Sequence, residues 1–247
     1  MRRRIPLRLL ASCTPVLLGT VTLWSAAAPA GASTPTAAQL LSDSVDAAMG
    51  ANSLHFVDKT VAGKVHQTLV GNVSAATAGE QVTSSAAPVT VELIDGVAYV
   101  QAGTSVLQSS LGLPAAGAQT GNGKWIAVHP ADAAFSELTQ DLTIGSEVNS
   151  YIPVTHLKMG KVHTLAGRKV VTISGTAPSS ASNNARGARG TAFLVVPLKA
   201  PYLPIEAGLT VNSSKGSFNE AAAFTDWNAK ITITPPPNPI LYSSLLG

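Results

Sequence analysis

Hydrophobic and polar residues alternate along most of the chain after residue 50. Val89, Val91 and Leu93, for example, alternate with Thr90 and Glu92. A period of two is typical of antiparallel strands that are buried on one face. Strands are therefore expected within residues 54–57, 65–73, 89–94, 97–100, 124–128, 154–162, 169–175, 191–196, 205–211, 216–224 and 230–234.

Helical spacing of apolar residues occurs in three shorter segments. The first, at 37–49, has Thr36 as its candidate N-cap and ends at Gly50. We expect two further helices within 104–113 and 130–142. Glycine-rich, irregular and polar segments predict loops at 112–123, 143–153 and 177–189.

The order of these elements narrows the fold class. Roughly nine to eleven antiparallel strands combine with about three helices, and strands do not alternate regularly with helices. This order argues against a doubly wound parallel fold, and we find no repeat at solenoid spacing. We predict one α+β domain built on a large antiparallel sheet.

The N-terminus has the three parts of a secretory signal. A basic start at 1–8 precedes an apolar stretch at 16–28, and small residues at 30–32 permit cleavage after Ala32. The apolar stretch is shorter than the ~20 residues of a spanning helix. Cys13 follows lipobox-like letters but precedes the apolar stretch, so we expect no lipid anchor there. For an exported protein, we predict a signal peptide at 1–32, a linker at 33–35, a domain at 36–238 and a tail at 239–247.

Composition and charge narrow the partners. The chain is 45% apolar, 12% charged and 5% aromatic, so charge-driven disorder is not expected. Beyond residue 32, the chain has twelve basic and thirteen acidic residues. Because no positive excess is left to neutralise phosphates, nucleic acid is not an expected partner. We expect a monomer without a cofactor.

Motifs for catalysis are few. The chain contains neither Gly-x-Ser-x-Gly nor His-Glu-x-x-His, and Trp125 stands where a phosphate loop needs Ser or Thr. His156 and His163 lack a nearby carboxylate or cysteine that would complete a metal site, so no metal is expected. A hydrolase using paired carboxylates is a third functional hypothesis and predicts a cleft with perturbed pKa values. Its candidate pairs are Asp132 with Glu137, and Glu220 with Asp226.

The expected sheet leaves open how its inner face is filled. Its inward positions are aliphatic, large aromatic residues are few, and the helices are few and short. A curved sheet covered by few helices can leave an unfilled apolar lumen. The same residues also suit a normally packed core, so composition leaves both interpretations open.

Several short motifs follow one another in a defined order. They are Ala51-Asn-Ser-Leu-His-Phe56, Asp95-Gly-Val-Ala-Tyr99-Val, Leu111-Gly-Leu-Pro114, Gly123-Lys-Trp-Ile126, Pro130-Ala-Asp-Ala-Ala-Phe135, Leu138-Thr139, Leu203-Pro-Ile-Glu206 and Phe224-Thr-Asp-Trp227. In this order the chain resembles the actinobacterial LppX/LprG-type lipoproteins, whose fold is similar to that of the LolA and LolB lipoprotein carriers. The resemblance covers nearly all of residues 36–238.

This resemblance implies a curved antiparallel half-barrel sheet with a few helices packed on its concave face. It also implies a non-catalytic carrier whose hydrophobic cavity takes acyl chains of lipids or glycolipids in the cell envelope. Alternation and the resemblance together give these candidates for the lining: Leu54, Phe56, Val65, Leu69, Val91, Leu93, Tyr99, Phe193, Val195, Leu209 and Val211.

Two features of the chain modify that expectation. Arg186 and Arg189, in a polar loop, are candidates for contact with a lipid headgroup. Family members usually carry the lipobox cysteine directly after the apolar stretch, whereas Cys13 precedes it, which favours a secreted form. Transient contacts with a membrane surface or envelope transport proteins would fit a carrier. The alternative is an envelope interaction module of the same fold, with a filled core and no ligand.

Overall fold

The computed structural model describes residues 35–74, 78–84, 88–140, 142–178, 189–213 and 216–247. Its first helix, α1 (Ala37–Met49), has the predicted ends. The Thr36 hydroxyl accepts a hydrogen bond from the backbone N–H of Gln39 at 3.2 Å, and Oε1 of Gln39 accepts one from the backbone N–H of Thr36 at 2.9 Å. This capping box satisfies N–H groups that a helix start leaves free.

The strands among the described residues form one sheet of 13 members. They are β1 (Ser53–Ala62), β2 (Val65–Ser74), β3 (Ala78–Ser84), β4 (Val89–Ile94), β5 (Val97–Ala102), β6 (Trp125–Val128), β7 (Thr155–Met159), β8 (His163–Leu165), β9 (Arg168–Thr176), β10 (Arg189–Pro197), β11 (Glu206–Ser213), β12 (Gly216–Thr225) and β13 (Ile240–Leu241). Their order is β13-β6-β5-β4-β3-β2-β1-β12-β11-β10-β9-β7, with β8 beside β9. All pairs are antiparallel except β13 with β6, and the sheet does not close into a barrel.

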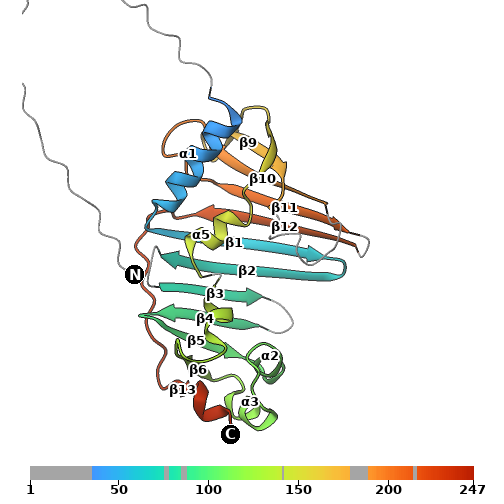
Figure 1. The fold of residues 1–247 in the computed structure, drawn as a ribbon. Coiled ribbons are helices and arrows are strands. Elements are labelled where there is room, and N and C mark those ends of the chain that lie inside the picture. The colour runs from blue at the N-terminus through green and yellow to red at the C-terminus, as the bar shows by residue number, and fades with distance from the viewer. Residues whose placement is uncertain (1–34, 75–77, 85–87, 141, 179–188, 214–215) are drawn as a thin grey trace, which may run out of the picture. The chain divides into compact units, whose positions relative to one another are not determined.

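Short helices lie against this sheet (Figure 1). They are α2 (Thr104–Ser109), α3 (Ala115–Gly121), α4 (Phe135–Thr139), α5 (Ile144–Asn149) and the 3-10 helix η1 (Tyr242–Leu245). The predicted α+β half-barrel with helices on its concave face is thus confirmed.

Several local predictions were wrong. The expected helices at 104–113 and 130–142 are shorter, and α3 and α5 occupy segments expected to be loop or irregular. A second capping box explains α5, because Thr143 and Ser146 exchange hydrogen bonds at its start. The strand expected at 230–234 is absent from the described sheet, and that segment runs outside it toward three prolines.

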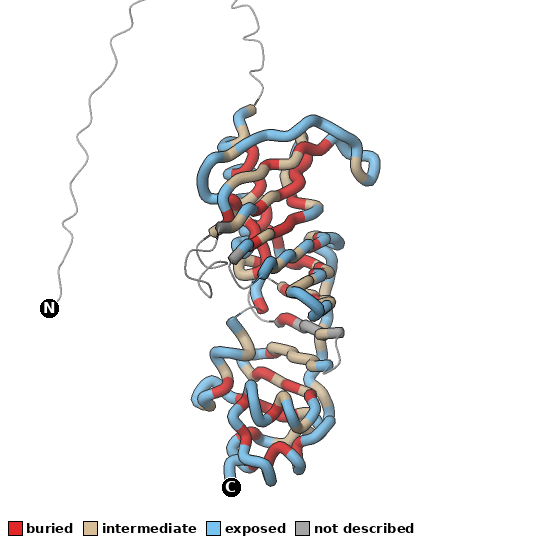
Figure 2. The backbone as a smooth tube through the Cα atoms, turned by 90° about the vertical axis from the view of Figure 1, so that its right-hand side faces the viewer, coloured by how far each residue is buried: buried red, intermediate tan, exposed pale blue. Residues whose placement is uncertain are grey.

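Strand register fixes which side chains share a face of the sheet. Phe56 of β1 stands opposite Gly71 of β2 and Phe224 of β12. Because alternate residues point to opposite faces, the positions in register with Phe56 form one continuous face. This face lies under α1 and α5, and we call it the concave face (Figures 1 and 2).

Two separate hydrophobic cores cover the concave face. The α1 core joins α1 and α5 to the neighbouring strands β1, β12, β11, β10 and β9. It includes Leu40, Leu54, Phe56, Val148, Tyr151, Ile173, Leu194 and Phe224. The tail core joins α2, α3 and η1 to β5 and β6, and includes Val100, Leu107, Ala118, Ile126, Val128, Tyr242 and Leu245. In Figure 2, buried residues are found toward both ends of the sheet.

The C-terminal residues are part of the tail core, although the sequence analysis placed them outside the domain. β13 pairs with β6, and the Tyr242 and Leu245 side chains are buried. The Tyr242 hydroxyl donates a hydrogen bond to the Leu111 carbonyl at 2.8 Å. The compact unit accordingly extends from Pro35 to Gly247.

Candidate functional site

One chain segment links the two cores across the concave face. Residues 135–140 and 142–151, here called the strap, contain α4 and α5. Figure 1 shows α5 of this segment lying over the sheet. Phe135 and Leu138 of α4 pack against the tail core, whereas Ile144 and Val148 of α5, and Tyr151 just after it, belong to the α1 core.

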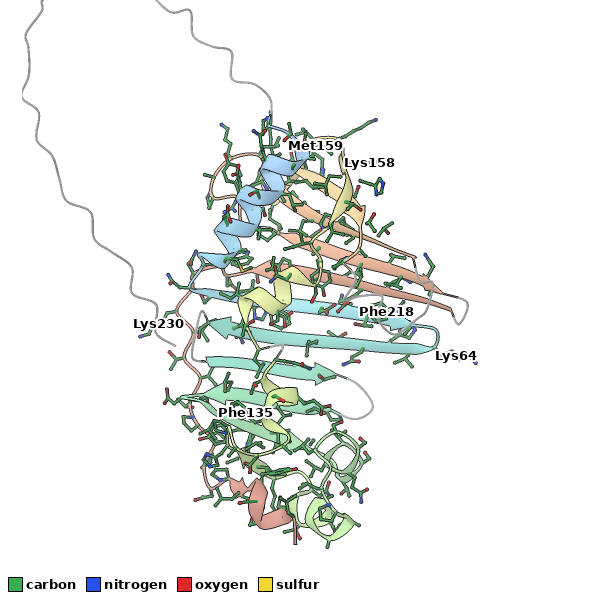
Figure 3. All side chains as sticks on the ribbon, viewed as in Figure 1. Lys64, Phe135, Lys158, Met159, Phe218 and Lys230 are labelled. Carbon is green, nitrogen blue, oxygen red and sulfur yellow. The ribbon has the colours of Figure 1, made fainter. Side chains whose placement is uncertain are left out.

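Between those helices the strap rests directly on β3. A Cβ added to Gly79 would lie 3.1 Å from the Cβ and carbonyl oxygen of Leu142, so glycine permits this close approach. Leu142 itself is buried. The strap therefore contacts the sheet at three places, and it lies over strands that carry half-buried aliphatic side chains (Figure 3).

Those side chains form a strip between the two cores. The concave strip consists of Leu69 of β2 and Val89, Val91 and Leu93 of β4, which the register places on one face. All four are half-buried. Leu69 packs against the α1 core, and Val89 and Val91 pack against the tail core. The strip is thus a stretch of the concave face whose aliphatic side chains are incompletely covered.

Most of the predicted lining residues lie on the concave face. The register places these seven there: Leu54, Phe56, Leu69, Val91, Leu93, Leu209 and Val211. The register places Val65 on the same face, but Val65 lies at the end of a hairpin and is 62% exposed. That the side chains on the concave face contact a lipid stays a prediction.

Three predicted lining residues point to the opposite face. Tyr99 pairs with Glu92, and the register likewise turns Phe193 and Val195 away from the strap. In β10 the run from Ala192 to Val196 is apolar throughout, so alternation could not decide which positions face inward. The ring of Phe193 instead covers Gly208 on the convex side, where a Cβ would collide with it.

The side chains of the two arginines proposed as headgroup contacts lie outside the described part of the structure, so their role stays a prediction. Arg186 lies outside the described residues. The backbone of Arg189 begins β10 and pairs with Asn212, while its side chain lies outside the described part of the structure.

A polar cavity lies where α5 meets the α1-core half of the sheet. It has a volume of about 220 Å³, and we call it the acid cavity. Its lining consists of Asp58, Leu69, Ser146, Glu147, Ser150, Tyr151 and Glu220. Leu69 also belongs to the concave strip, so the cavity adjoins that strip.

Asp58 is the most buried carboxylate that lines this cavity. Its side chain is only 5% exposed and points inward from β1, two residues beyond Phe56. The Tyr151 hydroxyl donates a hydrogen bond of 2.8 Å to its Oδ2. Its Oδ1 is buried, and the Asp58 carboxyl is also hydrogen-bonded to the side chain of Glu220.

Burial and mutual repulsion perturb the acidic groups here. Loss of solvent, followed by the neighbouring Asp58 carboxyl, raises the pKa of Glu220 to about 8. Burial, with smaller contributions from the Glu220 and Asp58 charges, raises the pKa of the Tyr151 hydroxyl above its ordinary value. Near neutral pH, Glu220 therefore carries a proton, and Tyr151 stays a hydrogen-bond donor.

The predicted carboxylate pairs do not form this cluster. Glu220 lines the acid cavity with Asp58 instead of Asp226, which is exposed next to Trp227. Asp132 accepts a hydrogen bond of 2.7 Å from the backbone N–H of His129. One signal was available in the sequence, because Asp58 continues the inward positions of Leu54 and Phe56.

The histidines lie apart from this cavity. His156 and His163 are both exposed, and Nδ1 of His156 lies 3.1 Å from the Thr155 hydroxyl. Within the described ranges, no three His, Cys, Asp or Glu side chains are grouped as metal ligands.

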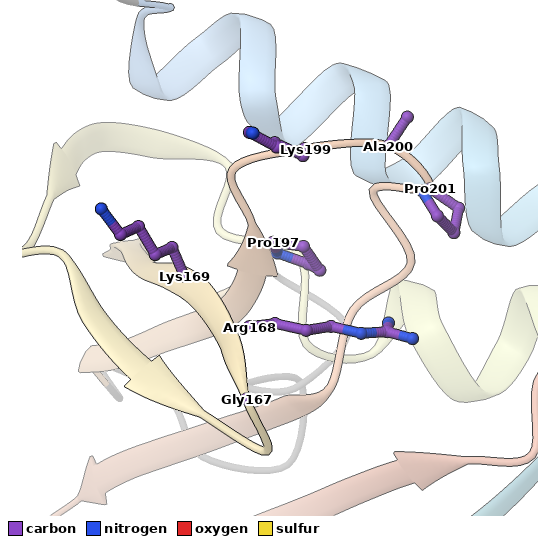
Figure 4. A pocket seen from close by; sticks show the side chains of 7 residues that line it. All are labelled: Gly167, Arg168, Lys169, Pro197, Lys199, Ala200 and Pro201. Atoms are coloured by element: carbon purple, nitrogen blue, oxygen red, sulfur yellow. The ribbon is translucent and has the colours of Figure 1, made fainter.

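Two further hollows lie where β9 begins and β10 ends. The basic hollow, of about 470 Å³, is lined by Gly167, Arg168, Lys169, Pro197, Lys199, Ala200 and Pro201 (Figure 4). A neighbouring hollow of about 490 Å³ shares Arg168 and Pro201 and adds the apolar side chains of Leu203, Ile205, Phe224 and Trp227. The Trp227 indole N–H donates to the Pro204 carbonyl at 3.0 Å, which fixes the ring beside Phe224.

Comparisons with known proteins support the fold. No family model and no curated protein matches this chain. The solved structure of LprF from Mycobacterium bovis is 17% identical, with a TM-score of 0.53, and the match covers 82% of this chain and 99% of that one. Lipoprotein LppX from Mycobacterium tuberculosis is also 17% identical, with a TM-score of 0.51 over 79% of this chain and 98% of that one.

These matches extend over nearly the whole length of both lipoproteins. None of the described helices is long and apolar enough to cross a membrane. With its open antiparallel sheet and concave-face helices, the chain has the fold of the LppX/LprG-type lipoproteins.

Proposed function

We propose that this protein is an exported, non-catalytic carrier that binds acyl chains of lipids or glycolipids on its concave face. The concave strip is the observation that carries the proposal. Its four aliphatic side chains are half-buried between two packed cores, under a strap whose Leu142 rests on β3 at Gly79. A chain inserted beneath the strap would complete the burial of this strip.

The energetics of such an insertion are favourable. Each methylene removed from water contributes about 0.8 kcal/mol, so ten would give about 8 kcal/mol before the cost of ordering the chain. Strap movement would lower that gain, because the Leu142 contact with Gly79 would be lost. The fold shared with two lipoproteins and the signal-like N-terminus support a role in the cell envelope.

Native mass spectrometry would test the proposal first. The protein would be purified without detergent from a bacterial host that exports it, and any bound molecule would be extracted into organic solvent. We expect a co-purifying mass that extracts as a lipid or glycolipid. A clean apo mass, with no uptake of added acylated lipids, would instead support the interaction module with a filled core.

A pair of substitutions would locate the chain. Val91→Glu places a charge on the concave strip, whereas Thr90→Glu places it on the opposite face of the same strand. We expect Val91→Glu to reduce lipid retention at least tenfold and Thr90→Glu to leave it unchanged. Equal retention by both variants would show that the chain does not lie on this strip.

A hydrolase is a second candidate, because the acid cavity contains the perturbed carboxyl group that this hypothesis requires. Glu220 holds a proton near neutral pH, as a general acid would, and Asp58 is a neighbouring carboxylate. Organic extracts of the protein incubated with an added glycolipid would distinguish the two functions. A carrier returns an added glycolipid intact, whereas a hydrolase releases its cleaved parts, and release that stops in Glu220→Gln would favour the hydrolase.

A further inference from the structure

Charge is distributed unevenly along the chain. Residues 148–205 contain seven Lys and Arg residues and no Asp or Glu, whereas the rest of the chain beyond residue 32 contains five basic and thirteen acidic residues. Most of this basic segment forms β7 to β10, at the opposite end of the strand order from β13. One end of the sheet is therefore basic, although the chain beyond residue 32 is almost neutral as a whole.

The cations at this end have no acidic partners among the described residues. The five whose side chains the structure describes are Lys158, Lys161, Arg168, Lys169 and Lys199. All are exposed, and none of their side chains forms an ion pair with a described residue. Three of them line the basic hollow, whose lining contains no acid, since Asp226 lines only the neighbouring hollow (Figure 4). A surface lined by one sign of charge attracts a surface of the opposite sign.

Apolar side chains are exposed among these cations. Of the seven large hydrophobic side chains exposed in the described part of the chain, three are Val154, Met159 and Val162. Met159 directly follows Lys158, and Val162 directly follows Lys161, so basic and apolar side chains occur in adjacent pairs. Figure 3 shows Lys158 and Met159 beside α1. Contact with a less polar medium would remove the unfavourable exposure of these apolar side chains to water.

Strand pairing places these residues along one edge of the sheet. β7 and β8 both pair with β9 and with no other described strand, so they form the outer edge. β7 pairs with the second half of β9, and β8 pairs with its first half, beside the basic hollow. Together with the basic hollow, four side chains form what we call the basic edge: Lys158, Met159, Lys161 and Val162.

We propose that the basic edge docks the protein on an anionic lipid membrane, with its cations beside the lipid phosphates and Met159 and Val162 in the headgroup region. Basic residues and adjoining apolar side chains together hold peripheral proteins on such surfaces. A protein that adds a strand to this edge is the alternative occupant. The register shift between Thr155 and Lys158, and the break at 160–162, leave no continuous run for such pairing. The inference goes beyond the proposed carrier function, because docking does not depend on what the concave strip binds.

Vesicle flotation would test the docking. Protein secreted by an exporting host is mixed with vesicles of phosphatidylcholine alone or of phosphatidylcholine with about one third phosphatidylglycerol, and the floating fraction gives the partition coefficient. We expect the anionic vesicles to bind roughly tenfold more protein or better, and an increase in salt from about 0.1 M to about 0.5 M to release it. Equal binding to both kinds of vesicle overturns the proposal. Binding to neither also overturns it and favours the strand-adding protein as the occupant of this edge.

Two pairs of lysines would locate the electrostatic contact. Replacing Lys158 and Lys161 together by Gln should weaken binding to the anionic vesicles roughly tenfold. Replacing Lys64 and Lys230 together by Gln removes the same charge at exposed positions away from the basic edge, so binding should change less than about twofold (Figure 3). All variants share one N-terminus, so a difference between them reports on the basic edge. An equal loss in both pairs would indicate a diffuse charge effect and overturn the assignment of the surface.

A pair of valines would test the apolar contact. Val162 and Val65 are 55% and 62% exposed, and only Val162 belongs to the basic edge. Val162→Ser should weaken binding to the anionic vesicles roughly threefold, because less apolar surface would enter the headgroup region, and Val65→Ser should leave it unchanged. Unchanged binding in Val162→Ser would overturn the apolar contact. An equal loss in the two valine variants would place the contact outside the basic edge.

Discussion

The α1 core and the tail core cover the same sheet but treat buried polar groups differently. In the tail core, the buried Tyr242 hydroxyl is paired with the Leu111 carbonyl. In the α1-core half, the buried Ser44 hydroxyl of α1 has no hydrogen-bond partner among the described residues. Since an unpaired buried oxygen destabilises a fold, we expect this position of the α1 core to contribute less to stability than the paired Tyr242 of the tail core.

Packing at the glycines of α3 shows the same contrast. A Cβ at Gly117 would collide with the Leu245 carbonyl, and one at Gly121 would lie 2.9 Å from Cδ1 of Ile126. These close approaches join α3 to η1 and β6. In the α1-core half, the strap helix α5 instead borders a cavity of about 220 Å³. The helix α3 is thus packed more closely against its neighbours than α5 is, and the predictions below test that difference.

The largest expected effect comes from emptying the α1 core itself. Phe56→Ala removes a fully buried ring and should lower the free energy of unfolding by about 3–5 kcal/mol. Val65→Ala, at an exposed position on the next strand, should change it by less than about 0.5 kcal/mol. Urea unfolding monitored by tryptophan fluorescence would measure both. A loss below about 1 kcal/mol for Phe56→Ala would show that this half contributes little to stability.

The tight packing of the tail core predicts the next effect. Gly117→Ala forces a methyl group against the Leu245 backbone, which should cost about 3 kcal/mol or detach η1 from α3. Gly145→Ala is the matched control in α5, because its nearest neighbour, Met49 Sδ, lies 3.7 Å from the added Cβ. Thermal unfolding of the two variants gives the comparison. If both melt at the same temperature, the tail core is not the more tightly packed one.

The free energy of unfolding should depend on pH through Glu220, which lies in the α1-core half of the sheet. The pKa of Glu220 rises from an unfolded value near 4.5 to about 8, so the folded state binds the extra proton between those values. Stability is therefore highest below about pH 4.5 for this group and declines as pH rises to about 8, by about 2 kcal/mol after solvent screening. Glu220→Gln should abolish that decline, whereas Glu206→Gln, an exposed residue of β11, should preserve it. Unfolding curves between pH 5 and 8.5 would reveal it.

Much of the sheet could be predicted because its information is local. Alternation predicted most of the strands, and the Asp95-Gly96 turn joins β4 to β5 with positive φ at both residues. The orientation of β10 could not be predicted, because both of its faces are apolar and only pairing with β9 and β11 chooses between them. The expected strand at 230–234 was wrong because local pattern does not reveal whether a pairing partner exists.

The candidate site was only partly predictable for a related reason. Asp58 could be placed inward from its spacing to Phe56, but its partner Tyr151 is 93 residues away along the chain. Tyr151 is positioned by α5, whose start depends on a hydrogen-bond exchange between Thr143 and Ser146 rather than on apolar periodicity. A site assembled from an unforeseen helix and two strands cannot be read from spacing alone.

The smallest effect expected concerns a single hydrogen bond between the strap and the sheet. Tyr151→Phe removes the hydroxyl that donates to Asp58 Oδ2 but keeps the ring, which packs edge-on against Phe224 with centroids 6.1 Å apart. The free energy of unfolding should fall by about 1.5 kcal/mol, the lower end of the range for a hydrogen bond to a charged group. Amide hydrogen exchange should rise in α5 and stay unchanged in α3. Faster exchange in both helices would show that the two cores open together, which would contradict the difference in packing between them.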